Sequence, residues 1–191
     1  MNLDLVRDQL SKAYLDAPLV QQGLRQAAVL LPMTKIDQKW HLLYTRRSDT
    51  VMDHKGQVSF PGGAVENFDK SVEEAALREA YEEIGLLPQD AVVLGRISPQ
   101  KTITGYFVHP VVAVIPWPYI FCPSEEEVAR IFSIPIDWLS DPINWHEEPR
   151  RINEQWIENV IHYNDFDCEH LWGITARLTQ QFLDIIKKVR L

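Results

Sequence analysis

The order of hydrophobic and polar positions predicts strands in the first third of the chain and then an amphipathic helix. Apolar runs at residues 27–31 and 40–45 predict two strands, joined by a polar turn at residues 35–38. Residues 56–60 predict a third, shorter strand that leads into a pair of glycines. After a polar loop, residues 72–84 repeat their apolar positions at the helical period. This order of elements indicates an α/β or α+β class.

The rest of the chain adds further strands and a closing helix. Its predicted elements are strands at residues 91–97, 106–115 and 128–134, one helical turn at 136–139, a hairpin of 144–150 with 156–163, and an amphipathic helix over 172–189. Pro135 precedes the helical turn and Pro142 follows it, which is where proline marks the ends of a helix.

Residues 1–24 are predicted to form a helical cap on the domain. The apolar positions recur at helical spacing before Pro18 interrupts them: Leu3, Val6, Leu10 and Tyr14. No internal repeat, low-complexity tract or linker is evident along the chain, so we expect a single domain over residues 1–191.

Composition and charge narrow the class of protein. With 191 residues, of which 46% are hydrophobic and 24% charged, the chain can bury a substantial core. The formal net charge of −8 disfavours nucleic acid as a partner, because such surfaces normally need a basic footprint. The most apolar segment, residues 111–121, is too short to span a bilayer, and Pro116 and Pro118 interrupt it. We therefore expect no contact with a membrane.

The two cysteines give no metal or disulfide pattern. Cys122 and Cys168 are isolated, without a C-x-x-C spacing. We expect both to remain thiols in a reducing cytosol, and no secretory signal is evident at the start of the chain. The sequence therefore predicts a cytoplasmic protein.

The segment 72–84 carries the most unusual chemistry. Ser71 and Glu74 form a capping box at its start, and Gly85 is placed to end the helix. Around this helix the carboxylates Glu79, Glu82 and Glu83 share one narrow arc with Arg78 at its margin. A neighbouring arc can pack on a core, and it consists of Ala76, Leu77, Ala80, Tyr81 and Ile84.

Two interpretations of the carboxylate arc are open. Like charges three or four positions apart destabilise a helix by a few tenths of a kcal/mol per pair, unless a cation neutralises them. A hard divalent cation such as Mg²⁺ or Mn²⁺ suits carboxylate oxygens and substrate phosphates. The alternative is a solvated acidic face, which is what most charged helix surfaces are.

The surrounding residues favour the metal site, because together they resemble the signature of the Nudix hydrolases. That signature is G-x5-E-x7-R-E-U-x-E-E-x-G-U, where U is a bulky apolar residue. Phe60-Pro61-Gly62-Gly63 precedes the helix, Arg78-Glu79-x-x-Glu82-Glu83-x-Gly85 is intact, and Leu86 closes the pattern. The chain departs at Lys70, where the signature has Glu, and at Ala80, which is small. Its loop is also one residue longer.

A second motif resembles the coenzyme A pyrophosphatase branch of this family. It comprises residues 42–48, a spacer, and residues 56–63, and that branch also tends to lack the loop Glu. Similar segments recur downstream at residues 104–112, 127–132 and 171–176. The chain departs where the branch commonly has an Arg between Ser48 and Gly56. If that Arg contacts a substrate phosphate in the branch, then either Lys55, Arg46 or Arg47 replaces it here or the substrate is a different one.

The resemblance implies a fold, a reaction and a set of metal ligands. The fold is an α/β/α sandwich with a mixed β-sheet, and the reaction is hydrolysis of a phosphoanhydride that depends on Mg²⁺ or Mn²⁺. The implied metal ligands are Glu79, Glu82, Glu83 and a backbone carbonyl near Gly62 or Gly63. Arg78 would orient a carboxylate by bidentate pairing.

The general base is open between two carboxylates. Glu82 is the first candidate, and Glu127 is the second, from a later loop that also carries Glu125 and Glu126. The alternative for the whole run 125–127 is a solvated turn.

The resemblance implies a small nucleotide-like substrate. For the branch, this is coenzyme A or acyl-CoA, cleaved to 4′-phosphopantetheine and adenosine 3′,5′-bisphosphate, and the family also suggests a homodimer. The motif-associated cations for such a ligand are Arg46, Arg47, Lys55 and Lys101, each of which is otherwise a surface charge. His54 and His109 lie in family-like segments without ligand spacing. Two alternatives are a Nudix enzyme acting on ADP-ribose or NADH and a module that binds a nucleotide without hydrolysing it.

Overall fold

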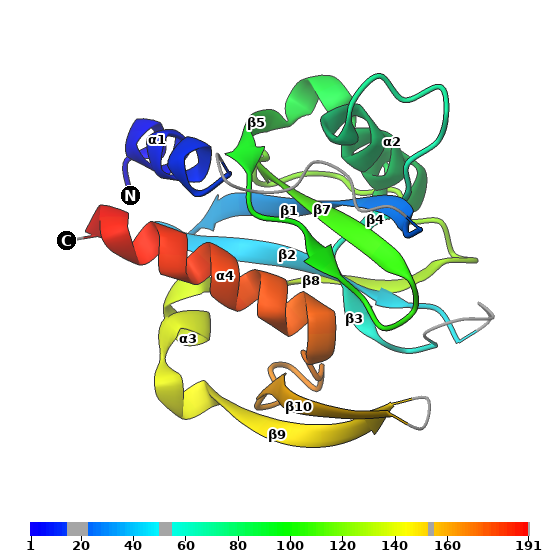
Figure 1. Ribbon diagram of the computed structural model, residues 1–191. Coiled ribbons are helices and arrows are strands. Elements are labelled where there is room, and N and C mark those ends of the chain that lie inside the picture. Colours follow the sequence, from blue (N-terminus) through cyan, green and yellow to red (C-terminus); the bar gives the residue numbers. More distant parts are fainter. Residues whose placement is uncertain (15–22, 50–54, 153–154, 191) are drawn as a thin grey trace.

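The computed structural model describes residues 1–14, 23–49, 55–152 and 155–190 (Figure 1). Its helices are α1 (Leu3–Tyr14), α2 (Val72–Ile84), α3 (Ile136–Ser140) and α4 (Gly173–Arg190), with short 3₁₀ helices at Pro88–Asp90 and Pro142–Asn144. Its strands are β1 (Arg25–Ile36), β2 (Lys39–Arg47), β3 (Val58–Ser59), β4 (Gly62–Ala64), β5 (Val92–Arg96), β6 (Gln100–Lys101), β7 (Tyr106–Val114), β8 (Val128–Pro135), β9 (Trp145–Ile152) and β10 (Gln155–Tyr163).

The main sheet is mixed. Its strands follow the order β3-β2-β1-β7-β5, while β4 pairs with β1, β6 with β7, and β8 with β2. The pair β1 and β7 is parallel, and the other pairs are antiparallel. The expected mixed α/β fold is therefore confirmed. Strands β9 and β10 form a separate antiparallel hairpin.

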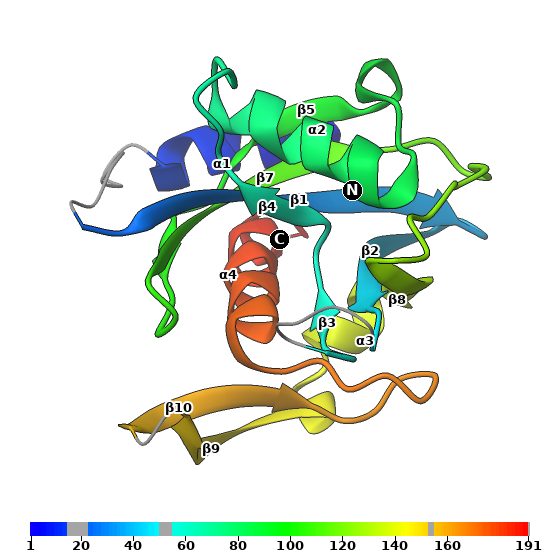
Figure 2. The same ribbon diagram turned by 90° about the vertical axis from the view of Figure 1, so that its right-hand side faces the viewer.

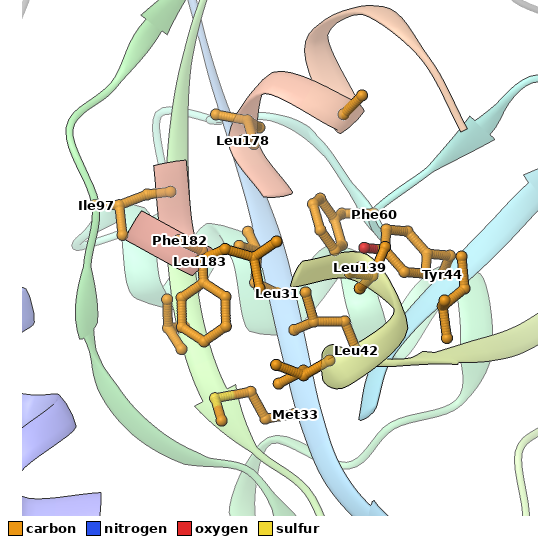
Figure 3. Packing of buried hydrophobic residues seen from close by; sticks show 14 of the residues in the cluster. Leu31, Met33, Leu42, Tyr44, Phe60, Ile97, Leu139, Leu178, Phe182 and Leu183 are labelled. Carbon is orange, nitrogen blue, oxygen red and sulfur yellow. The ribbon is translucent and has the colours of Figure 1, made fainter. Parts of the chain in front are cut away.

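Hydrophobic residues are buried on both faces of this sheet. One face packs on α2 and contributes Ala28 and Leu30 of β1, whereas the other packs on α1, α3 and α4 and contributes Leu31 and Met33. Figure 2 shows α2 and α4 on opposite sides of β1. Figure 3 shows Phe182 and Leu183 of α4 packed beside Leu31. Because β1 is covered on both faces, it is apolar along most of its length.

Most predicted elements occur where the hydrophobic pattern placed them. The helix over 72–84 is confirmed, and the turn between the first two strands contains Asp37 and Gln38, both with positive φ (47° and 65°) as a tight hairpin turn requires. The third strand is shorter than predicted and consists of Val58–Ser59. The N-terminal helix ends at Tyr14, and residues 15–22 of the predicted cap lie outside the described residues.

The apolar side of α1 anchors that helix on the domain. Val6 and Leu10 are fully buried, and Leu10 lies against Gly95 of β5, where an added Cβ would come within 3.1 Å of its side chain. Among the described residues, no helix is long and apolar enough to cross a membrane.

Candidate active site

Helix α2 is held at both ends by the residues that its sequence predicts. The Ser71 side chain accepts a hydrogen bond from the Glu74 N–H over 3.2 Å. The Glu74 carboxylate accepts from the Lys70 N–H over 2.9 Å, one position before the partner that a regular capping box uses. At the other end, Gly85 adopts a left-handed conformation (φ 69°). These caps fix the start and the end of the acidic helix.

The buried side of α2 is displaced toward the carboxylates. Ala76, Ala80 and Ile84 are buried as expected, but Glu83 is buried with them at 4% exposure. Tyr81, which the sequence assigned to the core-facing arc, is 51% exposed, so that assignment is wrong. The helix packs through its alanines, and their small side chains bring the Glu83 side close to the sheet.

Glu83 reaches beneath the helix to the glycine turn. Its Oε2 accepts a hydrogen bond from the Gly62 N–H over 3.2 Å, and its Oε1 lies 3.7 Å from Nη1 of Arg47. Burial raises the pKa of Glu83 to about 8, although the Arg47 charge and the Gly62 hydrogen bond oppose this shift. A divalent cation beside this carboxylate would stabilise its charged form, as the Arg47 charge and the Gly62 hydrogen bond do.

Arg78 connects the loop, strand β4 and the acidic helix. It donates to both oxygens of Asp69 at 3.0 Å each, and to the Ala64 carbonyl at 3.0 Å. Its Nη1 donates to Glu79 at 2.8 Å and to Glu82 at 2.9 Å. The bidentate partner of Arg78 is therefore Asp69, a residue that the sequence had not indicated because the signature places its carboxylate at position 70.

Glu79 lies against the second glycine. A Cβ atom placed on Gly63 would come within 2.5 Å of Oε2 of Glu79, so the backbone and the carboxylate touch only because position 63 has no side chain. Burial raises the pKa of Glu79, and the hydrogen bond from Arg78 opposes this shift. Glu82 differs from both neighbours, since 52% of its side chain is exposed.

Glu127 reaches the site through the loop that follows β7. The N–H groups of Cys122 and Ser124 donate to the carbonyls of Ile84 and Glu83, and this attaches the loop to the end of α2. The carbonyl of Glu127 accepts from the Ser48 N–H over 2.8 Å. The Glu127 charge contributes to the raised pKa values of both Glu79 and Glu83. Glu125 and Glu126 are exposed in the same loop.

The two adjacent arginines of β2 lie on opposite faces of the sheet. Arg47 points to Glu83 and α2, whereas Nε of Arg46 lies 3.4 Å from Glu169 on the α4 face. Arg46 pairs across the ladder with Arg130 of β8, which donates to Glu169 over 3.0 Å. The sequence-based prediction assigned Arg46 and Arg47 to the same substrate site. Consecutive residues of a strand point in opposite directions, so the two side chains lie on different faces.

A hollow of about 470 Å³ lies on the Arg46 side of the sheet. Its lining residues are Arg46, Gly56, Gln57, Arg130, Cys168, Glu169, His170 and Trp172. Nε of Arg46 is buried and has no hydrogen-bond partner among the described residues. Arg130 lies in the family-like segment 127–132, but its pairing with Arg46 was not predictable because it depends on the register between β2 and β8.

The remaining predicted residues lie further from the carboxylates. Lys55 is exposed just before the third strand, and Lys101 is exposed in β6 opposite Phe107. His109 is buried in β7, where its Nε2 lies 2.8 Å from the Gln26 side-chain oxygen, and burial lowers its pKa. His54 lies outside the described residues.

The oxygen-rich edge of α2 fits a hard divalent cation in its chemistry. Glu79 and Glu83 are largely buried carboxylates on either side of the glycine turn, and each is held by an arginine. Within the described ranges, no three His, Cys, Asp or Glu side chains are already gathered as a ligand set. Arg78 and Arg47 position these carboxylates, and a metal would be held by the oxygens that the arginines leave available.

The protein combines an α/β fold with a carboxylate-rich helix that packs on a glycine turn. These two features together define its class. A family model described as the NUDIX domain matches residues 24–158, and the chain belongs to the Nudix family. Nudix hydrolases generally use divalent metal ions, and the carboxylate edge of α2 agrees with that requirement.

Similar proteins support the same family. The chain is 36% identical over 177 residues to the uncharacterized Nudix hydrolase NudL of Enterobacter sp. (strain 638), and the match covers 91% of each chain. It is 38% identical over 164 residues to the protein of the same name from Pectobacterium atrosepticum, covering 86% of this chain and 83% of that one.

Solved structures share the fold. A mutT/nudix family protein from Listeria innocua matches with a TM-score of 0.55 and 16% identity, over 89% of this chain and 98% of that chain. The Nudix hydrolase RenU from M. smegmatis matches with a TM-score of 0.52 and 24% identity, over 63% of this chain and 76% of that chain. At these identities the similarity concerns the fold alone.

Proposed function

We propose that this Nudix hydrolase is a divalent-metal-dependent pyrophosphohydrolase that cleaves coenzyme A or acyl-CoA. The products are 4′-phosphopantetheine and adenosine 3′,5′-bisphosphate. The observation that carries the proposal is the position of the segment 56–63, whose sequence resembles the coenzyme A branch. Gly62, the second-last residue of this segment, donates its N–H to Glu83, so the branch-like motif lies directly against the acidic helix.

The metal ligands proposed are Glu79, Glu82, Glu83 and the backbone of Gly63. A bound Mg²⁺ or Mn²⁺ supplies positive charge over the phosphate oxygens and orients a water molecule. Arg78 holds Glu79 and Glu82 through one Nη1 atom and keeps their carboxylates on the same side of the helix. Arg47 stabilises the charged form of Glu83, which is the form that binds a cation.

The proton of the attacking water goes to Glu82 or, as the second candidate, to Glu127. Glu82 is the more exposed of the helix carboxylates, and it therefore meets solvent at the edge of the site. Glu127 lies in the loop that Cys122 and Ser124 attach to the end of α2. A carboxylate at either position has the chemistry to remove one proton from a water held at the metal edge.

Four cations are proposed to contact the substrate: Arg46, Arg47, Lys55 and Lys101. Arg47 is the nearest to the acidic helix through Glu83. Arg46 and Arg130 border the hollow on the other face, where a phosphate distant from the scissile bond would have to replace Glu169 as the partner of the two guanidinium groups. Coenzyme A has such a phosphate on its ribose, whereas ADP-ribose and NADH do not.

A substrate panel tests the proposal. Coenzyme A, an acyl-CoA, ADP-ribose, NADH and a diadenosine polyphosphate are each incubated with Mg²⁺, with Mn²⁺ and with chelator, and products are separated by chromatography. We expect cleavage of coenzyme A with either metal and none with chelator. Faster turnover of ADP-ribose or NADH than of coenzyme A would replace this substrate by the second candidate class.

The third candidate is a module that binds nucleotide without hydrolysis. Mutual repulsion among Glu79, Glu82 and Glu83 argues against it, because a pure binding module has no evident need for three such carboxylates. Binding of coenzyme A without turnover of any member of the panel would favour this candidate.

A further inference from the structure

Asp69 occupies the polar loop that leads into α2, one position before Lys70. The general Nudix signature has its loop carboxylate at position 70, where this chain has an exposed lysine. The Asp69 side chain, in contrast, is only 1% exposed. A carboxylate that is covered in this way requires partners that offset its desolvation.

Arg78 provides those partners through one edge of its guanidinium group. Nε donates to Oδ1 and Nη2 donates to Oδ2, both at 3.0 Å, in a bidentate pair. The backbone N–H of Glu66 donates to the same Oδ2 over 2.8 Å, which ties Asp69 to its own loop. The hydrogen bonds from Arg78 lower the pKa of Asp69, so the carboxylate stays charged at neutral pH.

The occupied edge decides how Arg78 meets the metal-edge carboxylates. Only Nη1 faces Glu79 and Glu82, and it gives each of them a single hydrogen bond. Each carboxylate therefore has a second oxygen that Arg78 does not bind. Without Asp69, this edge would keep only the Ala64 carbonyl as a partner of Nη2, and the guanidinium group could turn to form a bidentate pair with one of these carboxylates, which would withdraw both of its oxygens.

We propose that Asp69 is a positioning residue for metal binding. It keeps the bidentate edge of Arg78 occupied, so that Glu79 and Glu82 each retain an oxygen for a divalent cation. In this chain the loop carboxylate therefore lies one position before the Glu of the general signature. This inference rests on the metal site proposed above, but it does not depend on which nucleotide is cleaved.

Titration of the purified full-length protein with Mn²⁺ in the absence of substrate tests the inference. Isothermal titration calorimetry is performed on the wild type, on Asp69→Asn and on the neighbouring Lys70→Gln as the matched control. Loss of residues that orient metal ligands typically costs about 10- to 100-fold in affinity. We expect a loss of this size for Asp69→Asn and a change of less than about twofold for Lys70→Gln.

A double-mutant cycle separates positioning from a general loss of structure. Lysine at position 78 is a point charge without a bidentate edge, so Asp69→Asn should have little further effect on Mn²⁺ affinity in an Arg78→Lys background. An equal loss in both backgrounds, wild-type affinity in Asp69→Asn, or no Mn²⁺ binding by the wild type would overturn the inference. Circular dichroism and the Tm of each variant verify folding, and a protein that binds Mn²⁺ but does not cleave coenzyme A would refute only the proposed substrate.

Discussion

Glu83 and Gly62 are 21 positions apart in the chain and are joined by a hydrogen bond, in which the Gly62 N–H donates to Oε2 over 3.2 Å. This contact joins the acidic helix to the glycine turn. It also holds a carboxylate in a buried place, where its pKa is raised to about 8. The proton on Glu83 and the charge of Arg47 should therefore affect both stability and titration.

Replacement of Glu83 by glutamine should flatten the pH dependence of stability in the metal-free protein. The pKa of Glu83 is about 8 in the folded state and 4.5 as a model value. Between these values the folded state retains a proton that the unfolded state has lost. The free energy of unfolding therefore falls as pH rises through this window, by at most about 1.4 kcal/mol per pH unit. Glu83→Gln removes this loss.

Chemical denaturation at pH 5, 6, 7 and 8 in chelator measures the effect. The exposed loop residue Glu66 provides the control, and Glu66→Gln should retain the slope of the wild type. Equal slopes for Glu83→Gln and the wild type would show that Glu83 does not hold the proton.

The two arginines of β2 should have separable effects. Arg47 opposes the rise in the pKa of Glu83, so Arg47→Gln should move that pKa further up. Arg46 lies on the other face against Glu169, so Arg46→Gln should leave the titration of Glu83 unchanged. Carboxyl ¹³C NMR of the metal-free protein follows this titration. A similar displacement in both variants would contradict the opposite placement of the two side chains.

A side chain at position 63 should disturb the metal edge. In Gly63→Ala, the new Cβ would lie 2.5 Å from Oε2 of Glu79, so the carboxylate has to move. We expect the Mn²⁺ concentration for half-maximal activity to rise by about 10- to 100-fold, as for other changes that misplace metal ligands. The neighbouring exposed Ala64 supplies the control, and Ala64→Ser should change this value little. Unchanged metal dependence in Gly63→Ala would place the cation away from Glu79.

The two candidate bases can be distinguished by replacing each glutamate with glutamine and measuring turnover. Loss of a general base typically lowers turnover by about 10²- to 10⁴-fold. We expect Glu82→Gln to show such a loss in kcat at saturating metal, whereas Glu127→Gln should lose less. Near-normal turnover in Glu82→Gln, with a large loss in Glu127→Gln, would assign the base to the later loop. Glu125→Gln and Glu126→Gln complete the series and should resemble the wild type.

Gly85 should be the more sensitive of two glycines with similar backbone conformation. Both Gly85 (φ 69°) and Gly105 (φ 83°) have positive φ, so alanine strains each by about 1 kcal/mol. At position 85 the added Cβ would also come within 2.9 Å of the Cys122 side chain, while no atom of the described residues lies within 4 Å at position 105. Thermal unfolding should therefore show a larger decrease in Tm for Gly85→Ala. Equal decreases in Tm would show that Cys122 can move away from the added Cβ without a loss of stability.

Local sequence was sufficient for the acidic helix and its caps. Ser71 and Gly85 lie at its two ends, and their effects depend on hydrogen bonds within a few residues. The same holds for most strands, because burial on two faces leaves an apolar run that is visible in the chain. The shift of the buried side from Tyr81 toward Glu83 was not predictable, since it depends on how closely the alanines approach the sheet.

The sequence by itself determined the family-like motif, the alternation of strands and helices, and the carboxylates Glu79, Glu82 and Glu83 on one arc. These follow from spacing along a single segment. Only the tertiary structure decided that Asp69 pairs with Arg78, that Arg46 faces Arg130 and Glu169, and that Glu83 is buried against Gly62. Each of these relationships depends on strand register or loop path, which brings distant residues together and which local hydrophobic periodicity does not encode.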